Sequence, residues 1–273
     1  SLRRRQRQMC IRDRDKCIRS IEEKGTYKNI EYIVIENNSQ KKETFAYYEK
    51  LQAENPKVKV VFWEREFNYS AINNYGVGFA KGEYLLFLNN DTEIINPDCI
   101  EELLGYCMRD DVGIVGARLY YEDDTIQHVG VIIGLGGVAG HTFVGEPKDS
   151  LGYFGRIVTA QDYSAVTAAC LMTKRKVFEK VNGFEEKLAV AFNDVDFCLK
   201  VREAGYLVVY NPYAELHHYE SKSRGLEDTE EKVLRFQGEI RTFQYRWKEI
   251  LNEGDPYYSP NLTLDKTDFS LRI

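Results

Sequence analysis

The stretch from residue 81 to residue 94, KGEYLLFLNNDTEI, decides the fold class of this chain. Residues 84–88 are aromatic or aliphatic throughout, which is typical of a strand buried on both faces of a sheet. Three polar residues, Asn89, Asn90 and Asp91, follow that strand directly. In open α/β sheets, ligands bind beyond the carboxyl ends of the strands. The stretch therefore predicts a central strand that leads into a binding site.

The segments around this strand alternate between strand patterns and helix patterns. Short apolar runs predict strands, and apolar residues at helical spacing that end at Gly predict helices. In chain order we expect a helix over 15–24, a strand over 32–35, a helix over 44–54, a strand over 58–63, and helices over 68–80 and 97–108 on either side of the central strand, then a strand over 112–117. This order predicts an α/β fold with a mixed, mostly parallel sheet flanked by helices.

The second half of the chain is less regular. We expect strands over 129–140, 165–173 and 206–210, and helices over 177–181, 195–204 and 229–251. The Gly-rich segment 130–155 is long for a loop in a compact domain, and such loops are often functional. We assign it to ligand binding as a lid, where the rings of Phe143, Tyr153 and Phe154 could stack on a bound molecule.

Composition excludes several classes of protein. The chain has 273 residues, 43% hydrophobic and 29% charged, which indicates a globular protein rather than a disordered one. Its net charge of -6 argues against nucleic-acid binding. The longest apolar stretch, 129–140, is about half of the roughly 20 residues that span a bilayer. We therefore expect no spanning helix and at most a peripheral membrane association.

The six cysteines and the N-terminal segment bear on location and domain boundaries. No CxxC pair is present, so we expect buried free thiols in the cytoplasm, possibly at the inner face of the plasma membrane. Residues 1–14, SLRRRQRQMCIRDR, are basic and lack the apolar core of a secretory signal. We expect them to be non-native or disordered, followed by one domain over 15–225 and a C-terminal helix and irregular tail over 226–273 packed on it.

Polar clusters at the ends of predicted elements carry the chemistry. Each cluster alone is more often a turn or a helix cap than a site. Together they suggest a metal site, because a hard divalent cation takes oxygen ligands such as Asp91 and leaves positions open for phosphate oxygens, and His218 could supply a further ligand. Asp194, at a helix start, could accept a proton from an incoming hydroxyl.

Five segments in this order resemble the family 2 glycosyltransferases, which are inverting enzymes with the GT-A fold. The segments are VIENNS, NNYGVGFAKGEYLLFLNNDTEI, AACLMTKRKVFEKVNGFEEK, AFNDVDFCLKVREAGYLVVYNP and HHYESKSRG. The resemblance covers residues 15 to about 225 and implies transfer of a sugar from a nucleoside-diphosphate sugar, with Mg or Mn as cofactor. It implies a UDP- or dTDP-sugar donor and a glycan or lipid-linked acceptor in bacterial surface-polysaccharide synthesis, with either a hexosyl or a rhamnosyl group transferred.

The resemblance also assigns roles to individual residues. The family's DxD motif falls on residues 89–91, which implies a metal held by Asp91 and His218. The general base falls on Asp194. The resemblance implies a donor site formed by Glu36, Asn38, Asn74, Asn89, Asn90 and Arg224, and an acceptor site that includes Asp196, His141 and Thr167.

This sequence departs from the family pattern at three places. Asn89 stands at the first DxD position and Asn193 stands before the base, where members carry acids. Members also open with a strand of the type VSIIIPxxN, and residues 1–14 stand in its place, so we expect the usual first strand to be missing. These departures keep an alternative open, an inactive transferase-like glycan-binding or scaffold module.

Two further alternatives have their own discriminating features. A nucleotidyltransferase also places a metal and a diphosphate at strand ends, but it needs a Gly-rich basic phosphate loop near the start, and this chain has none there. Nucleic-acid binding through the Arg-rich residues 1–14 would show strongly salt-dependent affinity. The sequence alone does not select the donor, the acceptor or the oligomeric state.

Overall fold

The computed structural model describes residues 2–219 and 229–272, which form a mixed α/β structure. Its main sheet has seven strands. Five of them run in the order β3 (Tyr84–Leu88), β10 (Cys170–Lys174), β5 (Val112–Tyr120), β11 (Leu207–His218) and β4 (Thr92–Ile94), while β6 (Ile126–His128) pairs with β5 and β9 (Gln161–Asp162) pairs with β11. The stretch quoted first from the sequence thus supplies β3, the turn behind it and β4.

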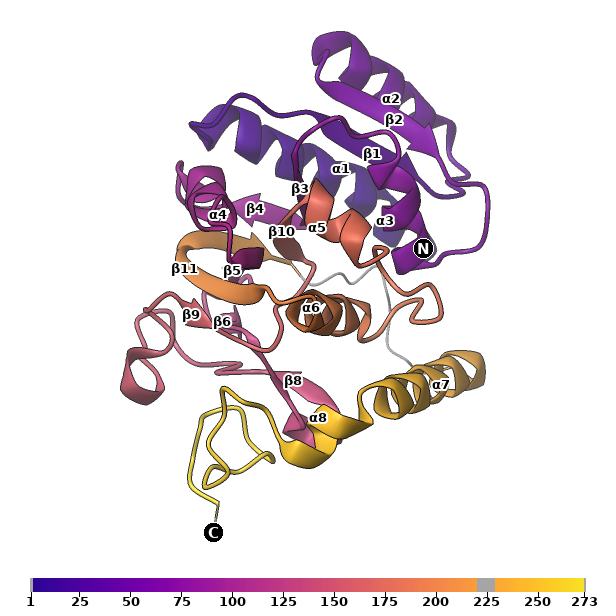
Figure 1. Cartoon of the computed structure of the whole chain (residues 1–273). Coiled ribbons are helices and arrows are strands. Elements are labelled where there is room, and N and C mark those ends of the chain that lie inside the picture. The colour runs from indigo at the N-terminus through magenta and orange to yellow at the C-terminus, as the bar shows by residue number, and fades with distance from the viewer. Residues whose placement is uncertain (1, 220–228, 273) are drawn as a thin grey trace.

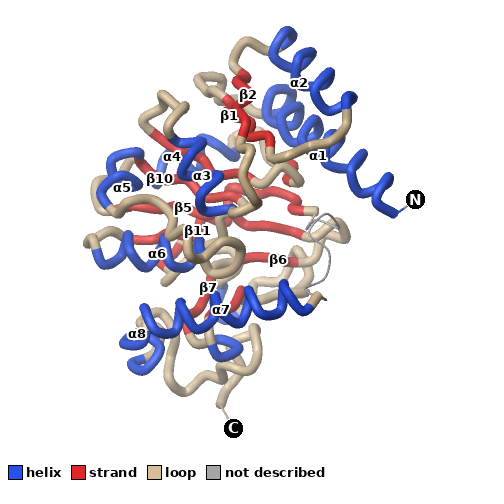
Figure 2. Tube along the Cα trace, turned by 90° about the vertical axis from the view of Figure 1, so that its right-hand side faces the viewer, coloured by secondary structure: helices blue, strands red, loops and turns tan. Residues whose placement is uncertain are grey.

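Strands β5 and β11 form the centre of this sheet. They pair in parallel from Leu207 opposite Val112 to His217 opposite Tyr120, with a bulge between Asn211 and Glu215. Strands β3 and β5 both pair with β10 in antiparallel register. The turn after β3 leads into β4, which pairs with the last residues of β11, so the residue after β3 lies close to the end of β11 (Figures 1 and 2).

A second, smaller sheet stands apart from the first. Strands β1 (Tyr32–Glu36) and β2 (Val58–Phe62) pair in parallel with each other. Helix α2 (Lys42–Glu54) connects them, and α3 (Tyr69–Val77) leads from β2 toward β3. In both views this unit lies at one end of the molecule, and the C-terminal elements lie at the other (Figures 1 and 2).

Helices of the central region pack in two core clusters around β5 and β11. Leu103 and Cys107 of α4 (Cys99–Cys107) join Val112 in one cluster. Phe197 and Val201 of α6 (Asn193–Glu203) belong to the other. At Gly113 a methyl group would lie only 2.4 Å from a side-chain carbon of Val201, so the close packing of α6 on β5 requires glycine there.

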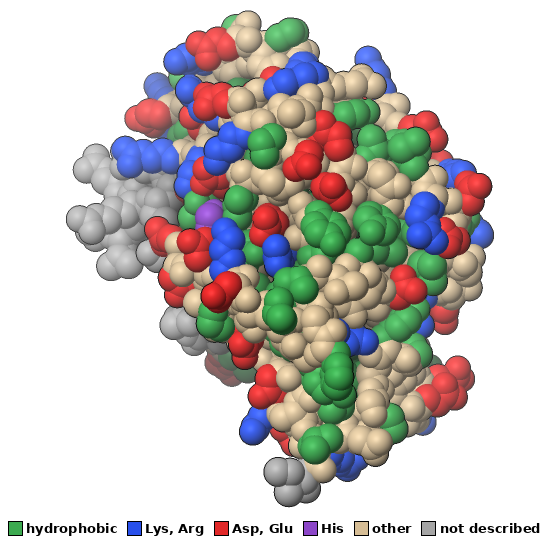
Figure 3. Space-filling model, turned by 90° about the vertical axis from the view of Figure 1, so that its left-hand side faces the viewer, with side chains coloured by type: hydrophobic (Ala, Val, Ile, Leu, Met, Phe, Trp, Pro, Cys, Tyr) green, Lys and Arg blue, Asp and Glu red, His purple; other side chains and the backbone are tan. Residues whose placement is uncertain are grey.

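The C-terminal elements share the same core as the main sheet. After α5 (Arg175–Lys180) and α6, the chain ends in α7 (Glu230–Arg246), α8 (Lys248–Glu253) and an irregular tail. Phe243, Trp247, Leu262 and Phe269 are buried members of the cluster that contains α6. On the face seen in Figure 3, acidic and basic side chains are interspersed among hydrophobic ones.

Several elements differ from the sequence prediction. Helix α1 runs from Leu2 to Lys24, so disorder over 1–14 is wrong for the described residues 2–14; this stretch contains neither Gly nor Pro and many helix-favouring Arg and Gln residues. The helix predicted over 229–251 is interrupted at Trp247. Strand β11 extends well past residue 210, because its bulge accommodates the Pro that would otherwise end the strand.

The first half of the segment predicted as a lid, residues 130–143, contributes buried side chains to the core, whereas residues 144–155 are exposed or half-buried. The whole segment contains β7 (Val131–Ile133), a short 3-10 helix (Leu135–Gly137), β8 (Ala139–His141) and a second 3-10 turn (Tyr153–Gly155). Phe143 is buried and stacks on Phe269 at 4.9 Å, and Tyr153 stacks on the same ring. Phe143 is therefore a core residue and does not offer a sugar platform, although Phe154 is exposed.

Of the strand predicted over 165–173, only residues 170–173 lie in a strand, as part of β10. Residues 165–169 form a loop that leads into it. Among the residues that the structure describes, no helix combines the length and the apolar character that crossing a membrane requires.

Candidate functional site

A cavity of about 380 Å³ opens where several strands and helices end. Its walls come from the residue after β3, from β6 and β8, from the loop before β10, from the first turn of α6 and from the end of β11. The polar side chains among its lining residues are Asn89, Gln127, His141, Thr167, Asp194 and His218, in addition to Tyr69, Tyr121 and Asn193. The structure thus brings together residues that are distant in the chain, such as Asn89 and His218, which lie 129 positions apart.

Asp194 lies in the first turn of α6 with both carboxylate oxygens oriented by backbone amides. The N–H of Ala168 donates to Oδ2 at 3.1 Å, and the N–H of Val195 donates to Oδ1 at 2.9 Å. Each oxygen has a second lone pair, so the carboxylate can accept a further hydrogen bond from a molecule in the cavity. The helix N-terminus also favours a negative charge here. Asp194 therefore has the position and the free lone pairs that a general base needs.

His218 lines the same cavity, and Asp91 lies next to it, outside the lining. Asp91 is buried in the turn between β3 and β4, and Nε2 of His218 lies 3.3 Å from its Oδ1. Nδ2 of Asn89 lies 3.2 Å from the same ring nitrogen. The backbone carbonyl of Asp91 accepts a hydrogen bond from the N–H of Tyr219 at 2.9 Å, which joins the turn to the end of β11. The neighbouring His217 points elsewhere and pairs with Asp124 at 2.8 Å.

This pair fits a divalent cation by its donor chemistry. Two ligands in adjacent positions of an octahedral Mg²⁺ site, each about 2.1 Å from the ion, lie about 3 Å apart. The 3.3 Å separation of Oδ1 and Nε2 is close to that value. Within residues 2–219 and 229–272, no group of three or more His, Cys, Asp or Glu side chains is arranged to hold a metal. Asp91 and His218 supply two donor atoms, and an octahedral cation held by them has further positions open to other oxygen ligands.

His128, next to Gln127 on β6, is fully buried and organises the loop before β10. Its Nε2 lies 3.3 Å from the backbone N–H groups of Gly130 and Thr167 and accepts from both. Burial lowers the pKa of His128 well below its usual value, and the nearby His141 and His218 lower it further. The side chain therefore stays neutral, as an acceptor of two hydrogen bonds must. Through Thr167 it supports the loop that holds Asp194.

The predicted nucleotide contacts lie at the end of β1. Glu36 is buried there, and its carboxylate accepts hydrogen bonds from the hydroxyl of Tyr48 and from the N–H of Ser39, the latter at 2.6 Å. Asn38 has a left-handed backbone, φ 54°, and its amide donates to the carbonyl of Arg65 at 2.8 Å. Both side chains shape the turn after β1, and neither lines the cavity.

Two predicted site residues have structural roles instead. The side-chain amide of Asn74 on α3 donates to the carbonyl of Phe184 and accepts from its N–H, so it joins two segments of backbone and is not directed at a donor. Asp196 has no exposed surface, and it accepts from the indole N–H of Trp247 at 2.9 Å and pairs with Arg246 at 3.1 Å. Asp196 is therefore not accessible to an acceptor, because Arg246 at the end of α7 and the following Trp247 cover it.

The remaining predicted residues divide between the cavity and its surroundings. His141 and Thr167 line the cavity, as an acceptor site would require. Asn90 is half-buried in the turn between β3 and β4 and does not line it. Arg224 lies outside the described residues.

Gln127 is a lining residue that the sequence analysis missed. It lies in the short strand β6, within the sequence IQH, where a single polar residue between an apolar residue and a His gives no recognisable motif.

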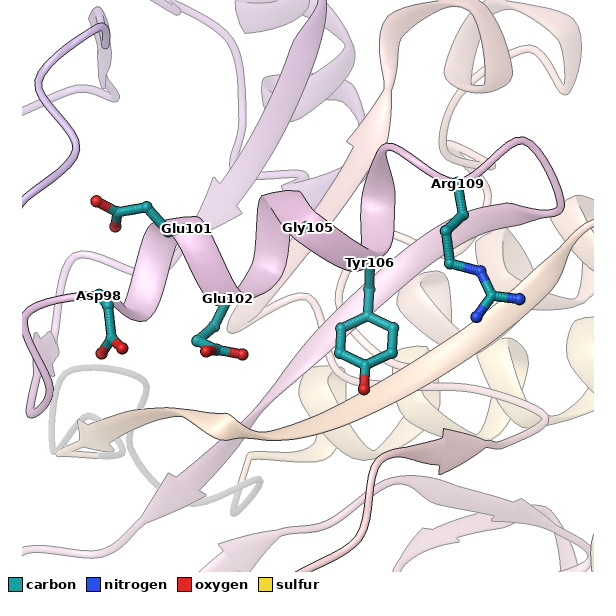
Figure 4. Close-up of a pocket in the computed structure, with 6 residues that line it drawn as sticks. All are labelled: Asp98, Glu101, Glu102, Gly105, Tyr106 and Arg109. Carbon is teal, nitrogen blue, oxygen red and sulfur yellow. The ribbon is translucent and has the colours of Figure 1, made fainter.

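A second cavity, of about 340 Å³, lies on the outer surface of α4 and has the wrong chemistry for a transferase site. Its walls are Asp98, Glu101, Glu102, Gly105, Tyr106 and Arg109 (Figure 4). Arg109 is paired with Asp111 at 2.7 Å, so three carboxylates dominate the lining. Such a surface repels a nucleoside diphosphate.

The comparison with protein families agrees with the motif order. Residues 15–181 match the model of glycosyl transferase family 2. The chain belongs to this family. The matched region contains both strands of the small sheet, β3 and the Asn89–Asp91 turn, while Asp194 and His218, predicted as base and metal ligand, follow it.

Two relatives match nearly the whole chain. Protein y4gI of Sinorhizobium fredii is 48% identical over 255 residues, and the O-antigen biosynthesis protein RfbC of Myxococcus xanthus is 38% identical over 248 residues. The matches cover 93% and 90% of this chain but only 28% and 19% of those relatives, which are much longer. An L-rhamnosyltransferase of Mycobacterium tuberculosis, which acts on N-acetylglucosaminyl-diphospho-decaprenol, is 37% identical over 60 residues, 22% of this chain and 20% of the enzyme.

Solved structures confirm the fold. GalNAc-T7, crystallised with UDP, GalNAc and Mn²⁺, superposes with a TM-score of 0.64 at 15% identity, over 86% of this chain and 47% of its own. The mannosyltransferase PcManGT of Pyrobaculum calidifontis, in complex with GDP-Man and Mn²⁺, superposes with a TM-score of 0.55 at 16% identity, over 85% and 64% of the chains. The predicted GT-A architecture is therefore correct.

Proposed function

We propose that this chain is an inverting glycosyltransferase that moves a sugar from a nucleoside-diphosphate sugar to a glycan or lipid-linked acceptor. The observation that carries the proposal is that Asp194 and His218 line one cavity, with Asp91 directly behind His218. A base and a cation-binding pair on one cavity are what a single displacement at a sugar carbon requires. Membership of family 2 supports the reaction type.

In the proposed reaction Asp194 is the general base. One of its carboxylate oxygens accepts the proton of the acceptor hydroxyl. At the same time the oxygen of that hydroxyl forms a bond to the anomeric carbon of the donor. The bond from that carbon to the diphosphate breaks, and the diphosphate leaves with the electron pair. One displacement inverts the configuration of the anomeric carbon. The backbone amides of Ala168 and Val195 hold the carboxylate in place.

Asp91 and His218 are the residues that would hold a divalent cation such as Mn²⁺ or Mg²⁺. When bound, the cation supplies Lewis-acid stabilisation of the charge that develops on the leaving diphosphate. The complexes of GalNAc-T7 and PcManGT both contain Mn²⁺, which supports this role. Asn89 replaces a carboxylate at the first motif position, so this chain offers one carboxylate and one imidazole.

The proposed donor and acceptor rest on residues near the cavity and on the relatives of this chain. The turn after β1, shaped by Glu36 and Asn38, lies outside the cavity and is the proposed contact for the nucleotide. A UDP- or dTDP-sugar agrees with the UDP in GalNAc-T7, and the rhamnosyltransferase and O-antigen relatives favour surface-polysaccharide synthesis. His141 and Thr167 would face the acceptor.

The proposal is tested by incubating the chain with UDP-, dTDP- and GDP-sugars in Mn²⁺ and measuring release of the nucleoside diphosphate. Release with one nucleotide, abolished in Asp194→Asn, is expected. The anomeric configuration of the product, read from its proton NMR coupling, should be opposite to that of the donor. Retention of configuration would contradict the single displacement.

A glycan-binding module that no longer transfers sugar is the competing function. The amides at Asn89 and Asn193, where the family pattern has acids, favour it. Binding of a glycan without release of any nucleoside diphosphate from the whole donor panel would select this second function over the first.

A further inference from the structure

Gln127 makes two hydrogen bonds to a single residue, His218. Its Oε1 lies 2.7 Å from Nδ1 of the His218 ring, and its Nε2 lies 3.1 Å from the His218 carbonyl oxygen. The side chain is buried at 4% exposure in the middle of β6. The side-chain amide of Gln127 therefore forms hydrogen bonds to both the ring and the backbone of His218.

The second of these bonds fixes the direction of the first. A carbonyl oxygen can only accept, so the nitrogen of the Gln127 amide must face it and the amide oxygen must face the ring. The oxygen accepts in turn, so Nδ1 of His218 carries the ring proton. In a neutral imidazole the other nitrogen, Nε2, then has the free lone pair.

That lone pair points to the proposed cation site. Nε2 is the atom that lies 3.3 Å from Oδ1 of Asp91. Nδ2 of Asn89 lies 3.2 Å from the same nitrogen and is placed to donate to it, so a cation that binds Nε2 takes the place of this hydrogen bond. Two electron-pair donors thus face each other, an arrangement that a cation between them stabilises. With the proton on Nε2 instead, His218 would donate to Asp91 and could not bind a cation.

We propose that Gln127 is a positioning residue that selects the Nδ1–H tautomer of His218 and so keeps Nε2 available to a divalent cation. This inference rests on the proposed function, because it takes Asp91 and His218 as the cation-binding pair. Partners of metal-binding histidines that hold the second ring nitrogen typically change metal affinity by about 10- to 100-fold when they are removed. Gln127 supplies that contact as a neutral amide.

The test combines ring NMR with titration of Mn²⁺ in the complete chain. The chain has four histidines, so ¹⁵N-labelled rings can be assigned with His218→Ala and the tautomer of each read from its nitrogen shifts. Gln127→Met removes both hydrogen bonds at nearly constant volume. We expect His218 to leave the Nδ1–H tautomer and the affinity for Mn²⁺, measured by electron paramagnetic resonance, to fall at least tenfold.

Two further variants keep the test decisive. Gln127→Glu retains an acceptor for Nδ1–H, so it should preserve the tautomer and hold the loss in Mn²⁺ affinity below threefold, even if Gln127→Met folds poorly. Gln161→Met removes an amide that bonds only to the carbonyls of Arg156 and Thr159, and it should change neither readout.

The outcomes separate this inference from the proposed function. If the wild-type chain binds Mn²⁺ and Gln127→Met binds it equally well with an unchanged tautomer, only the role of Gln127 is overturned. If Gln127→Glu loses the tautomer as Gln127→Met does, selection by an acceptor at this position is wrong. If the wild-type chain binds no Mn²⁺, the cation site of the proposed function fails, and the role of Gln127 toward a cation fails with it.

Discussion

The seven-stranded sheet and the small β1–β2 sheet differ in how completely they are buried. Val112, Ile114 and Val115 of β5 have no exposed surface, because helices and neighbouring strands cover both faces of that strand. In the small sheet, buried and partly exposed positions alternate along β1, and Phe62 at the end of β2 is half exposed. The residues proposed for base and cation chemistry lie on the larger sheet and on α6.

This difference matches the demands of the two tasks. Groups that take part in the chemistry must be held to within about half an ångström by tightly packed supports, and the larger sheet supplies that packing. The small sheet has its own cluster, in which Ile18 of α1 packs with Val34, Tyr48 and Leu51. A region with fewer buried contacts opens more readily. We therefore expect the nucleotide side to be the more mobile half of the site.

The largest expected effect tests the rigid half. Asp194→Asn keeps the size of the side chain but removes the proton acceptor, so kcat should fall by about 10³-fold or more while donor affinity changes less than threefold. Steady-state kinetics and donor titration measure the two quantities. Glu203→Gln, an exposed acid-to-amide change at the other end of α6, should leave both unchanged. A parallel loss of donor affinity in Asp194→Asn would instead assign this residue to binding.

A matched pair of substitutions tests the packing difference directly. Val115→Ala in β5 removes fully buried methyl groups from a covered strand and should cost about 2–3 kcal/mol of unfolding free energy. Val34→Ala in β1 removes the same atoms from a smaller cluster that can relax, and it should cost about 1 kcal/mol. Guanidinium unfolding gives both values. Equal costs would show that the small sheet is as well supported as the large one.

The smallest effect concerns the ionic contact between α1 and β4. Burial raises the pKa of Glu93, but hydrogen bonds from Lys16, Lys24 and Tyr219 outweigh it and lower that pKa to about 2. A carboxyl with a lowered pKa stabilises the fold above its unfolded value of about 4.5, and this contribution is lost as pH falls from there toward about 2. Both lysines are nearly half exposed, so the contribution is at most about 1 kcal/mol.

Unfolding of the wild type and Glu93→Gln at several pH values measures this contribution. The wild type should be the more stable protein at pH 6, and the difference should shrink steadily below pH 4. A difference that is constant from pH 6 to pH 3 would mean that Glu93 acts through packing and not through its charge.

Most of the fold could be predicted because its strands are continuous apolar runs. The predicted strands over 32–35, 58–63 and 84–88 and the helix over 44–54 agree with β1, β2, β3 and α2 to within two residues. Three-residue strands such as β4 and β6 could not be found this way, since a run of three residues has no detectable period. In addition, β4 pairs with β11, which is distant in sequence, while β6 folds back on its neighbour β5.

Only part of the site could be predicted, because the sequence shows motifs but not tertiary contacts. Motif order led to Asp91, Asp194 and His218, and the structure brings Asp194 and His218 to one cavity. Motif order could not reveal that Arg246 and Trp247 bury Asp196, because those contacts join residues about 50 positions apart. The two hydrogen bonds between Gln127 and His218 join residues that are distant in the sequence, so no local sequence pattern predicts them.

The central claim is that Asp91 and His218 form a cation site that binds the donor. We would measure binding of UDP, dTDP and GDP by calorimetry, with Mn²⁺ or with EDTA, to the wild type, to Asp91→Asn and to the exposed control Asp110→Asn. The account predicts that one nucleotide binds the wild type and the control at least tenfold more tightly with Mn²⁺, and that Asp91→Asn loses this difference. Equal affinity in Mn²⁺ and EDTA for the wild type would contradict it.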